Sequence, residues 1–288
     1  MSENKRIVFL DYLRVVACFM VMVVHACECF YFGADGGLHY DSAADAFWAT
    51  WIDSAVRACV PLFVIASSYL LFPVTNPAGE FFRRRLVRVV VPFVIWCALY
   101  VWRFDGKALA CLFNFPMATG GHLWFVPMLL GLYFRKFVPT LAWRKTLVIA
   151  APLWIVGYAI VGSLFYFRIP GGGTFPVSAP YSAAVDLEMS WMFCSTGVAM
   201  TVIAYFLILR KFTFDGWFYA KVVRPLSAAS YGTYLMHIMV LVILAGHLKG
   251  SAPAPIAIAA IAVGSFAISS LASIVIRKIP FVGKWVVG

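Results

Sequence analysis

The sequence predicts an all-α integral membrane protein, a polytopic bundle of about 8–10 transmembrane helices with both termini in the cytoplasm. Composition is the first reason. Of the 288 residues, 63% are hydrophobic and only 12% are charged, whereas soluble domains have about 45–50% apolar and about 25% charged residues. The second reason is a succession of apolar runs long enough to cross a bilayer. The third is the position of the basic residues between these runs.

The apolar runs form a regular series along the chain. A bilayer crossing takes about 20 predominantly apolar residues. The sequence offers eight such runs, roughly 7–28, 52–72, 88–103, 122–138, 146–166, 189–209, 226–247 and 254–276. The third and fourth are short for a full crossing, so one of them is expected to be tilted, broken or partly re-entrant. Residues 1–288 are therefore expected to form a single transmembrane domain, with a first run too long and too polar to be a cleaved signal peptide.

The basic residues set the predicted orientation. The net charge is +11, but no segment is long enough to form a soluble nucleic-acid-binding domain, so nucleic acid is not an expected partner. With the amino terminus inside, the outer loops hold only Arg103, Lys107, Arg168 and Lys249, and the other loop lysines and arginines are on the inner side. This asymmetry is the one that the positive-inside rule requires.

The first run carries ionisable groups where a simple anchor needs none. It contains Asp11, Arg14, His25 and Glu28, although a charge near the centre of a span costs at least about 2.5 kcal/mol. At about 100° per residue, Arg14 and His25 lie on one stripe, roughly 16 Å apart along the axis. Asp11 and Glu28 fall on or near that stripe. A snorkelling arginine or a packing histidine would explain either residue alone, whereas the shared stripe indicates a functional site.

Two further groups of charges lie near the second and third runs. Asp53 and Arg57 are four residues apart near the outer end of a predicted span, which predicts a structural ion pair. Arg84, Arg85 and Arg88 cluster at the inner end of the next span. They either contact anionic headgroups or clamp a phosphate, which the guanidinium fork binds bidentately. The sequence leaves both interpretations open.

The outer side and the last third of the chain add weaker candidates. His122 and Trp124 lie at the outer interface, and Tyr234 and His237 share a polar stripe, where His237 is most often a packing histidine. The outer loop at 167–188, with three glycines and three prolines, is expected to form a lid or an acceptor-binding surface. The five histidines show no metal-ligand spacing, so no metal is expected. Near the outer face a disulfide is conceivable, with no pairing favoured, among Cys27, Cys29 and Cys111.

Five segments together resemble the acyltransferase-3 family of bacterial membrane acyltransferases. In the family's order they are LDYLRVVA with Arg14 followed by His25, VPLFVIASSYLLF, FRRRLVRVVVPF, HLWFVPMLLGLY and SYGTYLMH. The sequence departs from the family at Ser67-Ser68-Tyr69, where Ser-Gly-Tyr is usual, which puts tight packing there in question. The family commonly has ten spans, and no appended esterase-like domain is expected here.

The resemblance implies transfer of an acyl group, usually acetyl, from cytoplasmic acyl-coenzyme A to a hydroxyl at the bacterial inner membrane. The acceptor would be an envelope glycan, a lipid-linked sugar or a related molecule, so the activity would be an O-acetylation such as polysaccharide modification. The phosphates of the donor would lie near Arg84, Arg85 and Arg88, and Arg14 would hold a phosphate or the amides of the pantetheine arm. His25 would be general base or acyl carrier, oriented by Glu28. Substrate contacts would come from His122, Trp124, Tyr234 and His237.

A polytopic transporter or flippase for an anionic solute or lipid-linked sugar is the alternative, with Arg14 as the binding residue. Two features disfavour it. The halves of the chain show no internal repeat of the kind that many transporters have. Acidic groups also avoid the middle of the predicted spans, where proton or sodium coupling usually requires them. A structural subunit of an envelope assembly is a third possibility, and it predicts that Arg14 and His25 tolerate substitution.

Overall fold

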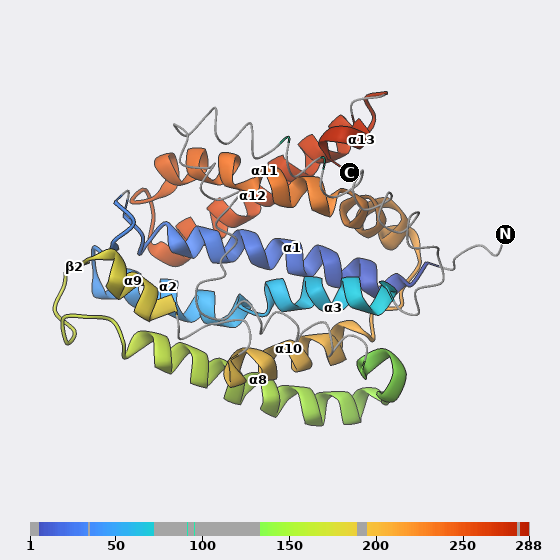
Figure 1. The fold of residues 1–288 in the computed structure, drawn as a ribbon, viewed down its shortest axis with the longest axis horizontal. Helices are drawn as coiled ribbons and strands as arrows, with labels where there is room; N and C mark the ends of the chain where they lie inside the picture. The colour runs from blue at the N-terminus through green and yellow to red at the C-terminus, as the bar shows by residue number, and fades with distance from the viewer. Residues whose placement is uncertain are drawn as a thin grey trace.

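The computed structural model describes residues 6–33, 35–71, 91, 95, 133–188, 195–280 and 283–287. In these ranges the chain is almost entirely helical, with two strands of three residues each. Figure 1 shows the long helices lying side by side along the longest axis of the molecule. The prediction of an all-α polytopic membrane protein is therefore confirmed.

The first predicted span forms the central helix of the bundle, α1 (Val8–Glu28). Figure 1 shows it between two layers: α11 (Arg224–Leu248) and α12 (Ala254–Arg277) on one side, α2 (Ala43–Val56) and α3 (Cys59–Leu71) on the other. It packs against all four helices, and most of its side chains are buried. The helix has no internal proline or glycine, so its backbone hydrogen bonds run without a break, as a membrane interior requires. Its polar stripe consequently faces protein.

Five helical stretches in the described part of the chain are long and apolar enough to cross a bilayer. They are Val8–Glu28, Ala43–Leu70, Trp143–Tyr166, Tyr219–Leu248 and Ala254–Arg277. A shorter apolar helix, α10 (Thr196–Leu209), coincides with the second half of the sixth predicted run. The third predicted run, 88–103, falls almost wholly outside the described residues, and of the fourth, 122–138, only residues 133–138 are described.

The second span begins earlier than predicted. Helix α2 begins after Ser42, whose hydroxyl oxygen accepts the Asp45 backbone N–H at 3.1 Å, the ordinary role of an N-cap serine. The second span therefore begins at Ala43 rather than near residue 52. Helices α2 and α3 follow each other across a short turn at Arg57 and Ala58. This shift places Asp53 and Arg57 near the middle of the helical stretch instead of its outer end.

Ser68 of α3 stands where the resembled family usually has glycine. Its side chain is fully buried, and its hydroxyl donates to the backbone carbonyl of Ile65 at 3.0 Å. A serine whose hydroxyl donates to a backbone carbonyl of its own helix needs no hydrogen-bond partner from another helix. Helix α3 packs against α1 with serine at this position.

Helices α8 (Trp143–Tyr166) and α10 form the layer farthest from α11 and α12 (Figure 1). A Cβ atom on Gly157 would lie 2.6 Å from the backbone oxygen of Gly197, so the two glycines allow the helices to approach closely. The opposite face of α8 exposes large apolar side chains such as Val148 and Ile155. Such an apolar outer face is suited to lipid contact.

Two segments that are far apart in the sequence meet at the outer end in a small sheet. Strand β1 (Leu38–Tyr40) pairs antiparallel with β2 (Val177–Ala179), with His39 opposite Ser178. The short helix α9 (Tyr181–Glu188) follows β2. The three glycines at 171–173 have φ of 93°, 58° and 91°, a conformation that glycine adopts without strain. The outer loop at 167–188 is thus partly regular.

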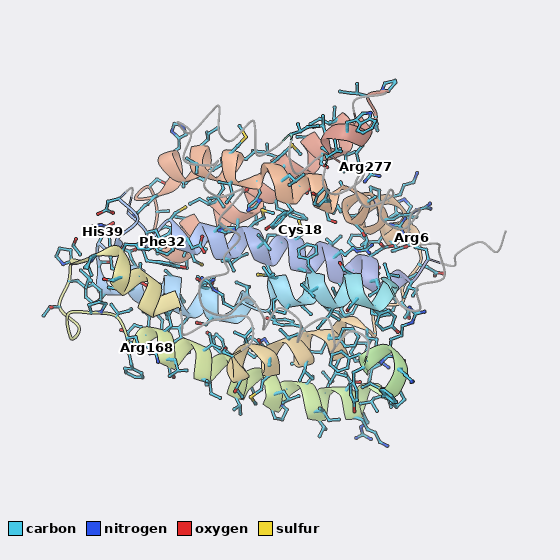
Figure 2. The ribbon with its side chains drawn as sticks, in the orientation of Figure 1. Arg6, Cys18, Phe32, His39, Arg168 and Arg277 are labelled. Carbon is cyan, nitrogen blue, oxygen red and sulfur yellow. The ribbon has the colours of Figure 1, made fainter. Side chains whose placement is uncertain are left out.

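The two ends of the bundle carry different side chains. Figure 2 shows Arg6 and Arg277 at one end and Phe32, His39 and Arg168 at the other. At the first end, basic side chains also donate to backbone carbonyls: Lys211 reaches Leu141 at 2.5 Å. The remaining elements also lie there, the π-helix η4 (Tyr219–Val223), which leads into α11, and α13 (Gly283–Val286). Opposite ends for Arg277 and Arg168 agree with the predicted topology.

Candidate active site on the first helix

Helix α11 faces the polar stripe of α1 from end to end. At the inner end the Ser227 hydroxyl donates to the Asp11 carboxylate at 2.6 Å. Toward the outer end the rings of His25 and His237 lie with their centroids 5.1 Å apart. Both residue numbers rise together along this contact, so the two helices run in the same direction. The predicted stripe therefore has one partner helix along its length.

At the inner end, Asp11 is a fully hydrogen-bonded buried carboxylate. Arg6 donates to it twice, at 2.5 and 3.0 Å. Tyr219 and Ser227 each donate a hydroxyl proton to it at 2.6 Å. Charge-assisted bonds of this kind offset much of the cost of burying the carboxylate. They also fix the π-helix and the start of α11 to α1.

Arg14 lies beside this cluster and remains available. A guanidinium nitrogen of Arg14 is 3.8 Å from the Asp11 carboxylate, and 28% of the side chain is exposed. Within the described residues Arg14 makes this ion pair and no hydrogen bond. Since a guanidinium has five N–H donors in a fork, Arg14 can still bind an anionic or carbonyl oxygen.

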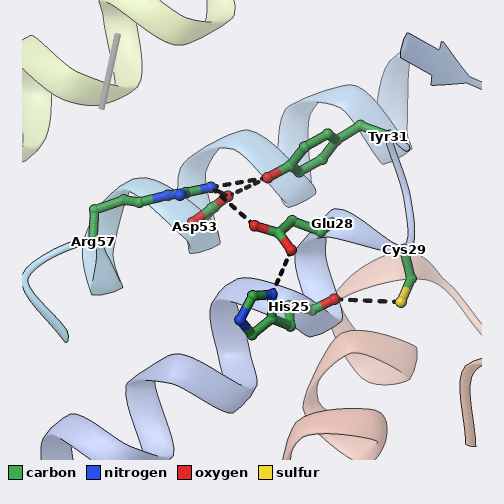
Figure 3. A network of polar contacts seen from close by, with 6 residues as sticks. All are labelled: His25, Glu28, Cys29, Tyr31, Asp53 and Arg57. Atoms are coloured by element: carbon green, nitrogen blue, oxygen red, sulfur yellow. Dashed lines mark hydrogen bonds and ion pairs between the residues drawn. The ribbon is translucent and has the colours of Figure 1, made fainter. Parts of the chain in front are cut away.

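At the outer end, His25 and Glu28 form a pair one helical turn apart. His25 Nδ1 lies 2.5 Å from Glu28 Oε2, as the dashed line in Figure 3 marks. Because an ionised carboxylate only accepts hydrogen bonds, Nδ1 carries the proton and donates it. The other ring nitrogen, Nε2, then has a free lone pair in the neutral ring. This is the arrangement of a general base with its orienting carboxylate.

Behind Glu28 lies a second, deeper group that the sequence did not connect with it. Arg57 is 2.6 Å from the Asp53 carboxylate and 3.7 Å from that of Glu28. The Tyr31 hydroxyl donates to Asp53 at 2.8 Å and accepts from Arg57 at 2.9 Å (Figure 3). Burial raises the pKa of Tyr31 well above its ordinary value, so this hydroxyl stays protonated. The predicted Asp53–Arg57 ion pair is confirmed.

His237 is the second histidine of the site. Its side chain is 3% exposed, and Nδ1 is hydrogen-bonded to the backbone oxygen of Tyr234. A carbonyl only accepts, so Nδ1 carries the proton and Nε2 is an acceptor. Among the described residues nothing donates to that Nε2, at a cost of about 1–3 kcal/mol for a buried polar group. The structure thus brings His237 to His25, with the Tyr234 ring beside it.

Several predicted site residues cannot be placed. Arg84, Arg85, Arg88, His122 and Trp124 lie outside the described residues. Cys111, a candidate for a disulfide, lies there too. In the described part of the chain Cys27 and Cys29 are free thiols.

The family assignment agrees with this geometry. A family model described as an acyltransferase domain matches residues 7–134 and 103–274. The two matches together include α1, α2 and α11, which form the site. The chain belongs to the acyltransferase-3 family. No curated protein and no solved structure matched the chain.

The protein is therefore a multi-pass membrane acyltransferase. The sequence named His25, Glu28 and His237 as candidates, and the structure brings these three together. It did not connect Arg57 and Tyr31 with them. The signal for Arg57 was present. A cation in the middle of an apolar helix is rarely only structural, but the late start assigned to the second span moved Arg57 to the interface.

Proposed function

We propose that this acyltransferase moves an acetyl group from cytoplasmic acetyl-coenzyme A to a hydroxyl of an envelope glycan, a lipid-linked sugar or a related acceptor. It would do so within a single transmembrane domain of the bacterial inner membrane. The observation that carries the proposal is the contact between His25 Nδ1 and Glu28 at 2.5 Å. It leaves Nε2 as a base inside a helix whose polar stripe continues to Arg14.

In direct transfer, His25 Nε2 takes the proton of the acceptor hydroxyl as its oxygen attacks the thioester carbonyl. The carbon–sulfur bond then breaks, and the leaving thiolate takes the proton from His25. Products are the acyl ester and the free thiol of coenzyme A. The Glu28 carboxylate stabilises the imidazolium that exists between these two proton transfers.

The same residues allow a two-step route. His25 Nε2 attacks the thioester carbonyl, the carbon–sulfur bond breaks, and coenzyme A leaves as the thiolate. The acceptor oxygen then attacks the acyl carbon, the bond from that carbon to Nε2 breaks, and the hydroxyl proton passes to the thiolate. Glu28 has the same orienting role in both routes. Trapping of an acetylated His25 peptide by mass spectrometry after rapid acid quenching would favour the two-step route.

The inner half of the stripe is suited to the donor. Arg14, whose donors make no hydrogen bond within the described residues, lies about 16 Å below His25, the helical rise over eleven residues. It would hold a phosphate or an amide oxygen of the pantetheine arm. The arginines Arg84, Arg85 and Arg88 would bind the phosphates, because guanidinium forks match phosphate oxygens. On the outer side the acceptor would contact His237 and Tyr234, with His122 and Trp124.

The experiment is acetyl transfer with purified protein in liposomes. Labelled acetyl-coenzyme A is supplied together with envelope material from a strain lacking the protein, and both thiol release and label in the glycan fraction are measured. His25→Ala should lower both rates by about 10²–10⁴-fold, the range for loss of a general base. His247→Ala is the matched control, since His247 is exposed near the end of α11 and should behave as wild type.

Two results would overturn the proposal. One is absence of thiol release from the wild-type protein with acetyl-coenzyme A and with longer acyl-coenzyme A donors. A transporter would give this result. The other is a His25→Ala protein that is folded and transfers acetyl at the wild-type rate.

A further inference from the structure

We propose that Arg57, Asp53 and Tyr31 form a positioning group that holds the Glu28 carboxylate and, through it, sets the pH at which His25 acts as a base. This inference rests on the proposed role of His25. It assigns to the second helix a part in the reaction that an isolated ion pair would not have.

The burial of this group is the first argument. The side chains of Asp53 and Arg57 are 0% and 6% exposed. A buried ion pair is often no more stabilising than apolar residues of the same size. Stability alone therefore does not account for a pair at this depth. The contact of Arg57 with a third group, the Glu28 carboxylate at 3.7 Å, does account for the burial of the pair.

The geometry of the hydrogen bonds is the second argument. One terminal nitrogen of Arg57 contacts Asp53, the Tyr31 hydroxyl and Glu28. The hydroxyl in turn donates to Asp53, so the guanidinium is fixed from two sides (Figure 3). The guanidinium at 2.6 Å favours the ionised form of the Asp53 carboxyl group. Without the cation, two carboxylates would lie near each other around His25.

The charges facing His25 can be named from each element packed against it. Helix α1 itself contributes Glu28, and α2 contributes Asp53 and Arg57. Helix α11 contributes His237. His237 is neutral in the tautomer that its carbonyl contact requires. In the described part of the chain the surroundings of His25 thus hold two carboxylates and one guanidinium, and a proton on His25 brings the cluster to neutrality.

This count predicts opposite effects for two nearly isosteric changes. Arg57→Met removes the cation, so the two carboxylates hold a proton on His25 more strongly. The acid limb of the rate profile then moves to higher pH. Asp53→Asn leaves one carboxylate and one guanidinium, so the proton is held less strongly and the limb moves to lower pH. Arg57 lies 3.7 Å from the Glu28 carboxylate that contacts His25, and a charge within about 4–6 Å shifts a titration by about one pH unit or more.

The test measures thiol release from acetyl-coenzyme A by protein in liposomes between about pH 5 and 9, where histidine titrates. The double variant Arg57→Met/Asp53→Asn restores the wild-type charge count and buries no unpaired charge. Its acid limb should return to the wild-type position, while its maximal rate falls because Glu28 is no longer held. Arg57→Lys keeps the charge without the fork, so its limb should stay within a few tenths of a pH unit of wild type.

The outcomes separate this inference from the function on which it depends. Limbs that stay at the wild-type pH in both single variants, or that move in the same direction, would overturn the positioning role while thiol release continues to require His25. Loss of the His25 requirement would overturn the proposed function instead. If Arg57→Met does not fold, Asp53→Asn must still move the limb to lower pH, and the double variant must move it back.

Discussion

Asp11→Asn is the substitution that tests how the inner end of α1 is held. In the native protein each carboxylate oxygen accepts one Arg6 N–H and one hydroxyl, from Ser227 on one side and from Tyr219 on the other. Asparagine keeps the shape but replaces one oxygen with an NH₂ group. The hydroxyl next to that group can rotate and accept from it, whereas the guanidinium can only donate.

The expected cost follows from this count. One charge-assisted hydrogen bond to Arg6 is lost, and such bonds are worth about 1.5–3 kcal/mol. Asp11→Ala removes all the acceptors at once and leaves buried donors unpaired, so its cost should reach about 3–5 kcal/mol. The free energy of unfolding should therefore be lower for Asp11→Asn than for the wild type, and lower again for Asp11→Ala.

Unfolding in mixed micelles, followed by tryptophan fluorescence as the denaturing detergent fraction rises, measures these changes. Two neighbouring tyrosines provide a matched comparison. Tyr219→Phe removes a bond to the Asp11 carboxylate, while Tyr12→Phe removes a bond to the neutral Phe214 carbonyl at 2.9 Å. Tyr219→Phe should cost about 1.5–3 kcal/mol and Tyr12→Phe about 0.5–1.5 kcal/mol. Equal costs, or an Asp11→Asn protein within about 0.5 kcal/mol of wild type, would refute the reasoning.

Other predictions concern packing and a thiol. Gly157→Leu should separate α8 from α10, because a Cβ atom there would lie 2.6 Å from the Gly197 oxygen. The expected cost is about 1–3 kcal/mol for overpacking. The control is Gly246→Leu, which should leave the melting temperature in detergent unchanged because a Cβ atom at Gly246 meets nothing within 4 Å. Ser68→Gly should lower the unfolding free energy by about 0.5–1 kcal/mol, the cost of helical glycine, and an increase in stability would contradict the packing described above. Cys29 should react slowly with maleimide at pH 7 and faster as the pH rises. Burial raises the pKa of this thiol to about 11, and the thiolate is the nucleophile. Rapid labelling at pH 7 would contradict its burial.

The five long spans in the described part of the chain were predictable because bilayer thickness constrains the length and composition of each apolar helix. The start of the second span was predicted wrongly for a physical reason. Asp41 and Asp45 lower the hydropathy of the segment before residue 52, whereas Ser42 and Asp45 form a helix cap. Capping residues are polar by necessity, so a cap at the head of an apolar helix lowers the local hydropathy just where the span begins.

The sheet at the outer end could not be predicted from the sequence, for a different reason. Strands β1 and β2 are three residues each and lie far apart in the chain. A strand of that length has too few alternating positions for a period of two to be recognised. Its pairing depends on which helices bring the two loops together, which is a property of the assembled bundle.

Helix α1, which carries the candidate active site, illustrates how much residue spacing alone can predict. The eleven-residue separation of Arg14 and His25 fixed which face of α1 is polar, and the three-residue step from His25 fixed Glu28 as its partner. Spacing within one helix gives no information about the helix opposite. That the facing groups are His237 from α11 and Arg57 from α2 depends on interhelical packing.

The ion pair on α2 follows from the same distinction. Four-residue spacing predicts that Asp53 and Arg57 meet, and it predicts this equally for an exposed helix and for a buried one. On a surface the pair would be worth about 0–1 kcal/mol and would have no influence on a distant base. Inside the bundle, where water does not screen it, one guanidinium between two carboxylates determines how strongly the cluster around His25 holds a proton. The proposed role of the pair therefore depends on its burial in the bundle and not on its spacing. That burial follows from where the helical stretch begins, which is at the Ser42 cap.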